Sequence, residues 1–251
     1  MNSELSNIKC FIIHLQRAKK RKKFVEDIVN KVPIISEIIY AVDGSSLSEK
    51  KINSIYSNKK IYNPKYPFKL NSGEIGCFLS HREAWRRIVD QKLEAGLIIE
   101  DDVRINPSIF NKSLNFTFKN ILKYKYIQFQ VRENKQKSTN IQTENELELL
   151  YPVPTQLRTS AQLVSFEAAV ELLNKTKKID RPVDTTLQMF WETKIKCYCV
   201  NKSGISDHTL EAGGSTLVQK NHSKLKLLRS IKRFVYRIKI LYLSKFQNKK
   251  I

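Results

Sequence analysis

Cysteine is scarce in this chain of 251 residues, and no long apolar run is present. The four cysteines, Cys10, Cys77, Cys197 and Cys199, include one C-x-C pair, whose spacing fits no common zinc or disulfide framework. We therefore expect reduced thiols and a cytoplasmic protein. No stretch of eighteen apolar residues could span a bilayer, and residues 1–9 lack the apolar segment of a signal peptide.

Acidic residues are also few. The chain has 24 Asp and Glu against 45 Lys and Arg, which gives a formal net charge of +21. Such an imbalance predicts a negatively charged partner, either nucleic acid, an anionic membrane surface or a phosphorylated substrate. The length and the 41% hydrophobic fraction indicate one compact domain with an appendage.

Three of the few acidic residues are consecutive. Glu100, Asp101 and Asp102 follow the apolar run of residues 97–99, which is typical of a buried strand. Ligand sites in open α/β sheets gather where strands end, and three adjacent carboxylates repel one another unless a cation or hydrogen-bond donors lie among them. Hard oxygen ligands suit Mg²⁺ or Mn²⁺, which often arrive with substrate phosphates. The alternative is a solvated acidic loop.

Strand and helix patterns alternate along the chain and predict an α/β fold. A strand at residues 9–15, a helix at 17–32 and a strand at 36–42 have the spacing of a parallel crossover unit. Further on we expect a helix within 47–66, a helix at 74–91, strands at 126–131, 161–165 and 196–200, a mobile loop at 132–146, a helix at 166–175 capped by Ser165, and a helix from Pro182 through Trp191.

Several of these segments resemble glycosyltransferase family 25, the bacterial lipopolysaccharide and lipooligosaccharide sugar transferases. The matching pieces are I-I-H-L-Q-R-A-K-K-R at 12–21, A-V-D-G at 41–44, L-N-S-G-E-I-G-C-F-L-S-H at 70–81, A-G-L-I-I-E-D-D-V at 95–103 and, more loosely, residues 161–165 and P-V-D at 182–184. They lie between about residues 9 and 217.

The resemblance implies a Rossmann-like core of the nucleotide-diphospho-sugar transferase (GT-A) type, which we assign to residues 1–218. It also implies an inverting transfer of a hexose from a uridine diphosphate sugar to a lipooligosaccharide or lipopolysaccharide acceptor. Galactose is the expected hexose, and glucose or another nucleotide sugar is the alternative.

Roles for the acidic triplet follow from the same resemblance. Asp102 is the expected ligand of Mn²⁺ or Mg²⁺, Glu100 the ribose contact and Asp101 a contact to the donor sugar. Related folds take a second metal ligand from a C-terminal histidine, and His208 is the best placed, although it also fits a surface position. His81 could support the triplet or satisfy a buried hydrogen bond.

Inversion requires a base on the acceptor side, and Asp184 of P-V-D is the candidate. The same residue could instead only cap a helix, because Asp is favoured at that position. Asp43 could contact the nucleotide or merely form a turn with Gly44. Arg17 could bind the donor phosphates as a forked donor, or it could belong to a solvated basic helix.

Residues 219–251 form a separate basic tail without any acidic residue. Leu228, Ile231, Val235, Ile238 and Tyr242 recur on one helical stripe, and basic residues lie largely opposite. The basic positions are Arg229, Lys232, Arg233 and Lys239. A helix of this kind binds anionic membrane interfaces; alternatively, its stripe packs on the catalytic domain.

The leading hypothesis is therefore a metal-dependent transferase that acts on a lipid-linked oligosaccharide at the inner membrane face, cytoplasmic and peripherally attached. A glycoside hydrolase would need two carboxylates spread across a cleft, whereas these are contiguous. A nucleic-acid-binding protein fits the charge, but the sequence contains no recognisable nucleic-acid motif, and we expect none as a partner.

Overall fold

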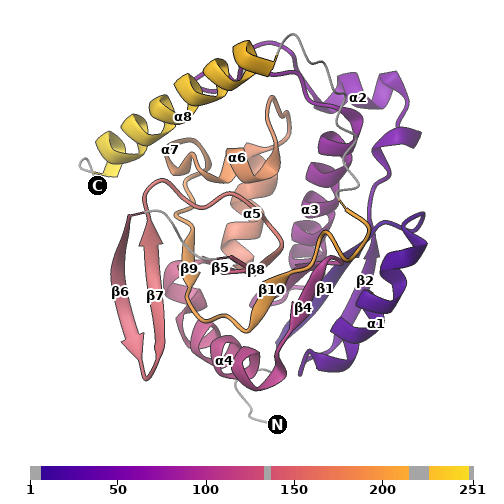
Figure 1. Cartoon of the computed structure of the whole chain (residues 1–251), viewed down its shortest axis with the longest axis vertical. Coiled ribbons are helices and arrows are strands. Elements are labelled where there is room, and N and C mark those ends of the chain that lie inside the picture. The colour runs from indigo at the N-terminus through magenta and orange to yellow at the C-terminus, as the bar shows by residue number, and fades with distance from the viewer. Residues whose placement is uncertain (1–6, 133–136, 215–225, 249–251) are drawn as a thin grey trace.

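The computed structural model describes residues 7–132, 137–214 and 226–248 (Figure 1). Within these ranges one large mixed sheet has eight strands and a small antiparallel sheet has two. The large sheet has the spatial order β2 (Ser36–Tyr40), β1 (Ile8–His14), β3 (Ala95–Glu100), β8 (Ala161–Ser165), β5 (Tyr126–Phe129), β9 (Tyr198–Val200), β7 (Leu147–Pro152) and β6 (Ser138–Glu144). The small sheet pairs β10 (Ile205–Asp207) with β4 (Val103–Ile105).

The strand directions bring several strand ends to one edge. β1 is parallel to both β2 and β3, which confirms the predicted crossover unit. β8 is antiparallel to β3 and to β5, so β5 runs in the same direction as β3. Consequently the carboxyl ends of β1, β2, β3 and β5 meet where β8 begins, and the acidic triplet lies at this edge.

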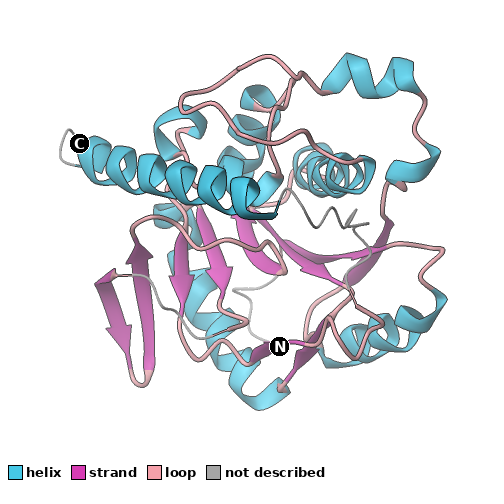
Figure 2. Cartoon of the chain, turned by 45° about the horizontal axis from the view of Figure 1, so that its top comes forward, coloured by secondary structure: helices cyan, strands magenta, loops and turns pink. Residues whose placement is uncertain are grey.

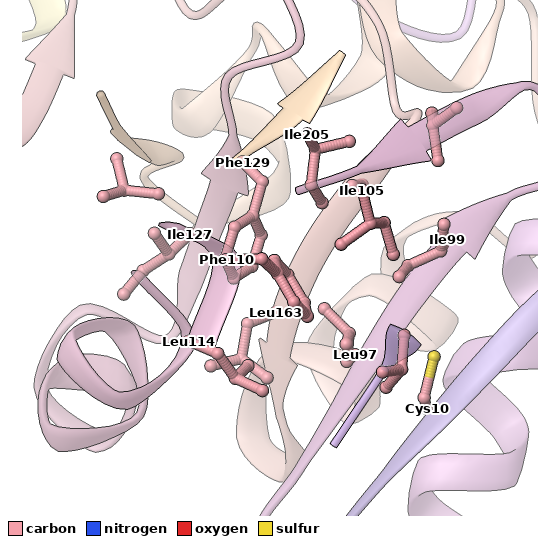
Figure 3. Packing of buried hydrophobic residues seen from close by; sticks show 14 of the residues in the cluster. Cys10, Leu97, Ile99, Ile105, Phe110, Leu114, Ile127, Phe129, Leu163 and Ile205 are labelled. Atoms are coloured by element: carbon pink, nitrogen blue, oxygen red, sulfur yellow. The ribbon is translucent and has the colours of Figure 1, made fainter. Parts of the chain in front are cut away.

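Helices cover both faces of the sheet (Figure 2). The first face carries α1 (Lys22–Lys31) and α4 (Pro107–Tyr124), and the second carries α3 (Ser72–Asp90), α5 (Phe166–Lys175) and α6 (Val183–Leu187). Strand alternation explains the two cores: Cys10 and Ile12 of β1 face the first, whereas Phe11 and Ile13 face the second. Figure 3 shows the first core, in which Phe110 of α4 packs near Phe129 of β5.

Most predicted elements are confirmed, including α5 with its Ser165 cap, whose side chain accepts from the Ala168 N–H. The structure also has α2 (Glu49–Ile55) within the predicted helical segment, and a short 3-10 turn, η2 (Lys19–Arg21), ahead of α1. The long helix α4 has no counterpart among the predicted elements.

Three predictions differ from the structure. The predicted mobile loop at 132–146 contains β6, an exposed polar strand on the edge of the sheet, where no apolar face is required. The strand at 196–200 is followed by β10, so it is not the last strand. The helix predicted through Trp191 is split into α6 and α7 (Phe190–Thr193), because Met189 leaves the helical conformation and enters a buried cluster.

The C-terminal helix α8 (Lys226–Asn248) lies across the α6 and α7 side of the molecule (Figure 1). Tyr236, Ile240 and Ser244 are its buried residues among the described side chains. The Tyr236 hydroxyl accepts a 2.9 Å hydrogen bond from Arg181, whose guanidinium is fully buried and paired with Asp180. The helix is therefore anchored to the α/β core by a polar contact.

The face that packs is not the predicted stripe. Leu228, Ile231, Val235, Ile238 and Tyr242 are all exposed, from 44% for Val235 to 65% for Tyr242. The predicted apolar stripe therefore faces away from the core. The boundary proposed between residues 218 and 219 lies outside the described residues, and no helix in the described ranges is long and apolar enough to cross a bilayer.

We predict that Tyr236→Phe lowers the free energy of unfolding by about 1.5–3 kcal/mol, because a buried guanidinium loses one hydrogen-bond partner. The matched control is Tyr242→Phe, which removes the same hydroxyl from an exposed position on the same helix and should change little. Urea unfolding of both variants measures the difference. Equal effects would contradict an anchoring role for Tyr236.

Candidate functional site

A cavity at the carboxyl ends of β1, β2 and β3 contains all four predicted donor-binding residues. Arg17 follows β1, Asp43 follows β2, Glu100 ends β3, and Asp101 follows β3 directly. Arg17 Nε donates to Asp43 Oδ2 at 2.6 Å in a partly exposed pair. Asp43 also caps η3 (Gly44–Ser46), and hydrogen bonds from Ser45 lower the pKa of its carboxyl. We name this hollow the first cavity.

Asp101 is the most enclosed member of the triplet. His14 Nδ1 lies 2.7 Å from Asp101 Oδ2, and Arg21 donates to Asp101 Oδ1 at 2.6 Å. Arg21 is itself buried and also donates to the carbonyls of Ala212 and Gly214. Both carboxylate oxygens of Asp101 thus have buried partners in the wall of the first cavity, and its predicted contact to a sugar stays a prediction.

Glu100 is held from two sides. His81 Nε2 lies 3.0 Å from Glu100 Oε1, and the Thr159 hydroxyl donates to the same oxygen at 2.9 Å. Burial raises the pKa of Glu100, but the neighbouring His81 and the Thr159 hydrogen bond outweigh burial, so this pKa is lowered. His81 is buried and its other ring nitrogen lies 3.2 Å from the Gln162 amide. His81 thus supports the triplet directly.

Of the three carboxylates, Asp102 has the weakest contacts with positive charge and hydrogen-bond donors. Its Oδ2 lies 3.3 Å from Arg21 and 3.2 Å from the Thr209 hydroxyl. Burial, together with the nearby negative charge of Glu100, raises its pKa to about 6. A carboxylate in this position favours a bound cation, because the cation would offset both effects. The residue therefore fits the divalent metal that the sequence predicts there.

His208 is close to Asp102 through the main chain, because its N–H donates to the Asp102 carbonyl at 2.9 Å. Its imidazole instead lies 3.0 Å from the exposed carboxylate of Glu211. The structure thus places residue 208 near the site, and the role of its ring as a metal ligand stays a prediction.

A second cavity of ≈ 430 Å³ adjoins the first, and Cys77 and Glu100 line both. Asp102 and Asp184 lie in its wall, the latter as the second residue of α6. The N-cap of α6 is Pro182, so Asp184 is not the cap residue. Its carboxylate accepts from the Thr185 N–H at 2.7 Å and the Arg158 N–H at 3.4 Å, while burial raises its pKa.

Two of the sequence motifs meet in space. A Cβ on Gly44 would lie 1.8 Å from the Ser72 carbonyl oxygen, and one on Gly76 would lie 2.5 Å from the Val42 carbonyl oxygen. The side chain of Ser80 accepts from the Val42 N–H at 2.8 Å. Glycine is therefore required where A-V-D-G packs on the first turns of α3, and this contact positions the α3 residues that face Glu100.

One group of three potential metal-ligating side chains is found among the described residues: Cys77, His81 and Glu100, whose donor atoms lie within 4.8 Å of one another. Burial raises the pKa of the Cys77 thiol, and His81 already contacts Glu100. A hard ion such as Mg²⁺ or Mn²⁺ prefers oxygen donors, so Asp102 suits it better than this mixed set.

Several residues of the site escaped the sequence analysis. His14 and Arg21 belong to a matching segment. His14 lies near the end of the strand predicted at 9–15, at the same edge of the sheet as the triplet, and this position could have identified it. Thr159 precedes β8, and Asp207 and Thr209 flank the end of β10, where no pattern marked them. Asp207 pairs with Arg158 at 2.7 Å, and hydrogen bonds from Thr209 together with this arginine outweigh burial and lower its pKa to about 2.

Comparison with known proteins gives the class. Residues 7–187 match the sequence profile of glycosyltransferase family 25 (LPS biosynthesis protein). The chain therefore belongs to this family, as its motifs predict.

Curated relatives match over part of their length. A "Glycosyltransferase 25 family member" of Drosophila melanogaster is 29% identical over 196 residues, which cover 76% of this chain and 32% of that protein. Human "Procollagen galactosyltransferase 2" is 38% identical over 113 residues, 44% of this chain and 18% of that protein. The chain thus spans about a third or less of the relatives that it matches.

Among solved structures, a 4-diphosphocytidyl-2C-methyl-D-erythritol synthase from Anaerococcus prevotii has a TM-score of 0.44 at 13% identity, covering 84% of this chain and 95% of that one. An inositol-1-phosphate CTP transferase from T. maritima has a TM-score of 0.43 at 10% identity, covering 90% and 96%. The fold itself, a central mixed sheet with helices on both faces and a C-terminal helix, agrees with the α/β prediction.

The raised pKa of Asp102 predicts a pH-dependent stability difference. Between about pH 4 and 6 the folded metal-free protein binds more protons at this carboxyl than the unfolded chain, so the carboxyl's contribution to stability falls as pH rises. Asp102→Asn should therefore be more stable than wild type at pH 7, by up to about 3 kcal/mol, and the gain should vanish near pH 4.

Denaturant unfolding in excess chelator, at pH 4 and pH 7, measures this difference. The control variant is Asp101→Asn, which breaks a buried ion pair and should be destabilised instead. A difference between Asp102→Asn and wild type that does not change with pH would contradict the account of Asp102.

Proposed function

We propose that this protein transfers a hexose, with inversion, from a uridine diphosphate sugar to a lipooligosaccharide or lipopolysaccharide acceptor. The observation that carries the proposal is the position of the acidic triplet at the junction of two adjoining cavities. The first cavity collects the predicted donor contacts, and the second contains the candidate base, as a two-substrate reaction requires.

The donor would lie with its nucleoside in the first cavity, between Asp43 and Glu100, and with its diphosphate toward Asp102. Transferases with a GT-A fold typically use a divalent metal, and Asp102 would hold Mn²⁺ or Mg²⁺ here. When bound, this ion supplies positive charge that stabilises the leaving diphosphate. Arg17, at the rim of the first cavity, could reach the phosphates as a forked donor.

Asp184 is the proposed general base. It lies in the wall of the second cavity, where two backbone N–H groups orient its carboxylate. Burial raises its pKa, which makes the carboxylate a stronger base for an acceptor hydroxyl than an exposed aspartate would be. As Asp184 takes the proton, the acceptor oxygen attacks the anomeric carbon from the face opposite the diphosphate. The new glycosidic bond forms while the bond to uridine diphosphate breaks, so the configuration at the anomeric carbon is inverted.

The substrates are proposed from the family. Its description names lipopolysaccharide biosynthesis, which supports a lipid-linked oligosaccharide acceptor. Human and mouse relatives are named procollagen galactosyltransferases, which supports galactose as the hexose. Glucose remains the alternative, because the two hexoses differ only in the orientation of one hydroxyl.

Asp184→Asn should lower turnover about 10²-fold or more, with donor affinity close to that of wild type, because only the base is removed. The assay follows release of uridine diphosphate in the presence of acceptor, with a panel of uridine diphosphate hexoses and Mn²⁺. Unchanged turnover in the variant would show that the base lies elsewhere. Absence of turnover with any donor in wild type would overturn the transferase assignment.

The proposal includes an anionic membrane surface as partner, at the inner face of the membrane. Helix α8 supports it, because its outer face carries exposed apolar residues, among them Leu227, Leu228, Ile231, Phe234, Val235, Ile238, Leu241, Tyr242 and Phe246. Lys232 and Lys239, both exposed, flank this face. Such a helix lies in a bilayer interface, where each basic residue near an anionic surface contributes about 1 kcal/mol.

Placing negative charge on this face should greatly weaken membrane binding. We predict that the double variant Ile231→Glu, Ile238→Glu loses most of its sedimentation with anionic vesicles while its melting temperature stays close to wild type, because both positions are about half exposed. The matched control is Leu122→Glu on α4, which is 62% exposed and should bind as wild type does. Wild-type binding by the double variant would contradict the membrane proposal.

A further inference from the structure

Three arginines lie along one edge of α8. Arg229, Arg233 and Arg237 are spaced four residues apart, so they project from the same side of the helix. Arg233 and Arg237 line the second cavity, together with Asp184. Arg229 and Arg233 also lie over the ring of Phe68, at 5.5 and 5.8 Å from its centre. An aromatic side chain thus holds part of this basic edge toward the cavity.

These arginines differ from the other arginines near the site. Arg158 pairs with Asp207, Arg21 with Asp101, and Arg181 with Asp180. In the part of the chain that the structure describes, no carboxylate lies within 4.0 Å of a guanidinium nitrogen of the α8 arginines. The guanidinium groups of Arg233 and Arg237 therefore line the cavity without forming an ion pair of this kind.

The position of this charge places it beside the candidate base. Arg233 and Arg237 line the second cavity with Asp184, and neither lines the first, where Arg17, Asp43 and Asp101 gather. Asp102, toward which the donor diphosphate is proposed to lie, also lines the second cavity, so the test measures KM for the donor as well as for the acceptor. The two arginines lie on the same side of the cavity system as the candidate base Asp184. An occupant that meets both Asp184 and these arginines is the acceptor.

Guanidinium groups bind phosphate oxygens through paired, charge-assisted hydrogen bonds. Two of them one helical turn apart can contact one phosphate group from adjacent positions. Helix α8 lies beyond residues 7–187, which the family profile matches. These arginines are thus not among the residues that the family profile matches.

We propose that Arg233 and Arg237 form a phosphate subsite that selects an acceptor oligosaccharide bearing a phosphate monoester. The inference rests on the proposed transferase function and names the acceptor class of that site. Because α8 also carries the exposed apolar face, one helix would place the subsite next to the lipid surface where such an acceptor is found.

The test compares acceptor kinetics without any lipid. The acceptor is the oligosaccharide released from lipooligosaccharide by mild acid, used before and after phosphatase treatment. In the double variant Arg233→Gln, Arg237→Gln, KM for the phosphorylated acceptor should rise about tenfold or more. KM for the nucleotide sugar, and the slow hydrolysis of the donor without acceptor, should stay unchanged. For the dephosphorylated acceptor, wild type and variant should be alike.

The matched control is Lys232→Gln, Lys239→Gln, which removes the same charge from the same helix at positions that do not line the cavity. It should behave as wild type in this lipid-free assay. Inorganic phosphate should compete with the phosphorylated acceptor in wild type and not in the arginine variant. This competition distinguishes the phosphate group from the sugar around it.

Three results would overturn the inference. A rise in KM for the nucleotide sugar would assign the arginines to the donor diphosphate. An equal rise in KM for both acceptors would show that the arginines do not recognise the phosphate group. An unchanged KM for both acceptors would show that the arginines bind neither of them. If wild type hydrolyses no nucleotide sugar, the transferase proposal itself fails, which is a different outcome from a variant that keeps hydrolysis and shows no acceptor effect.

Discussion

The mutual repulsion of three consecutive carboxylates is the constraint on which the site is built. Glu100 ends a buried strand, and Asp101 and Asp102 follow it in a buried turn, where water cannot screen the three carboxylates fully. His81 offsets the first, and His14 with Arg21 offsets the second. The pKa of Asp102 stays raised, because Arg21 and Thr209 only partly offset its burial and the negative charge of Glu100. The fold thus leaves one carboxylate whose charge a bound cation would stabilise.

The contacts that stabilise the three carboxylates also hold distant parts of the chain together. His14 comes from the end of β1 and His81 from α3, while Thr209 follows β10. The close packing of the Gly44 turn on α3 sets the position of His81, since a side chain at Gly44 would collide with the α3 main chain. The side chains of the site therefore reach their positions only if the glycine contacts and the ion pairs form together. This explains why the motifs contain both glycines and charged residues.

The sequence reveals the parts of this structure that depend on local patterns. Apolar runs predicted β1 and β3. Because the ends of parallel strands meet at one edge of a sheet, Asp43 and Glu100 were expected at the same edge. Tertiary contacts were not predictable in this way. The face of α8 that packs was missed because Tyr236, Ile240 and Ser244 form a narrow contact beside a wider apolar stripe. Strand β6 was missed because an exposed edge strand needs no apolar residues.

The central claim is that the triplet binds the diphosphate of a nucleotide sugar together with a metal. The most direct measurement is calorimetric titration of uridine diphosphate into wild type and into Asp102→Asn, each with Mn²⁺ and with excess chelator. The account predicts tight binding to wild type that requires Mn²⁺, and binding to the variant that Mn²⁺ does not improve, with the fold retained. Equal Mn²⁺-dependent affinity for both proteins would contradict it.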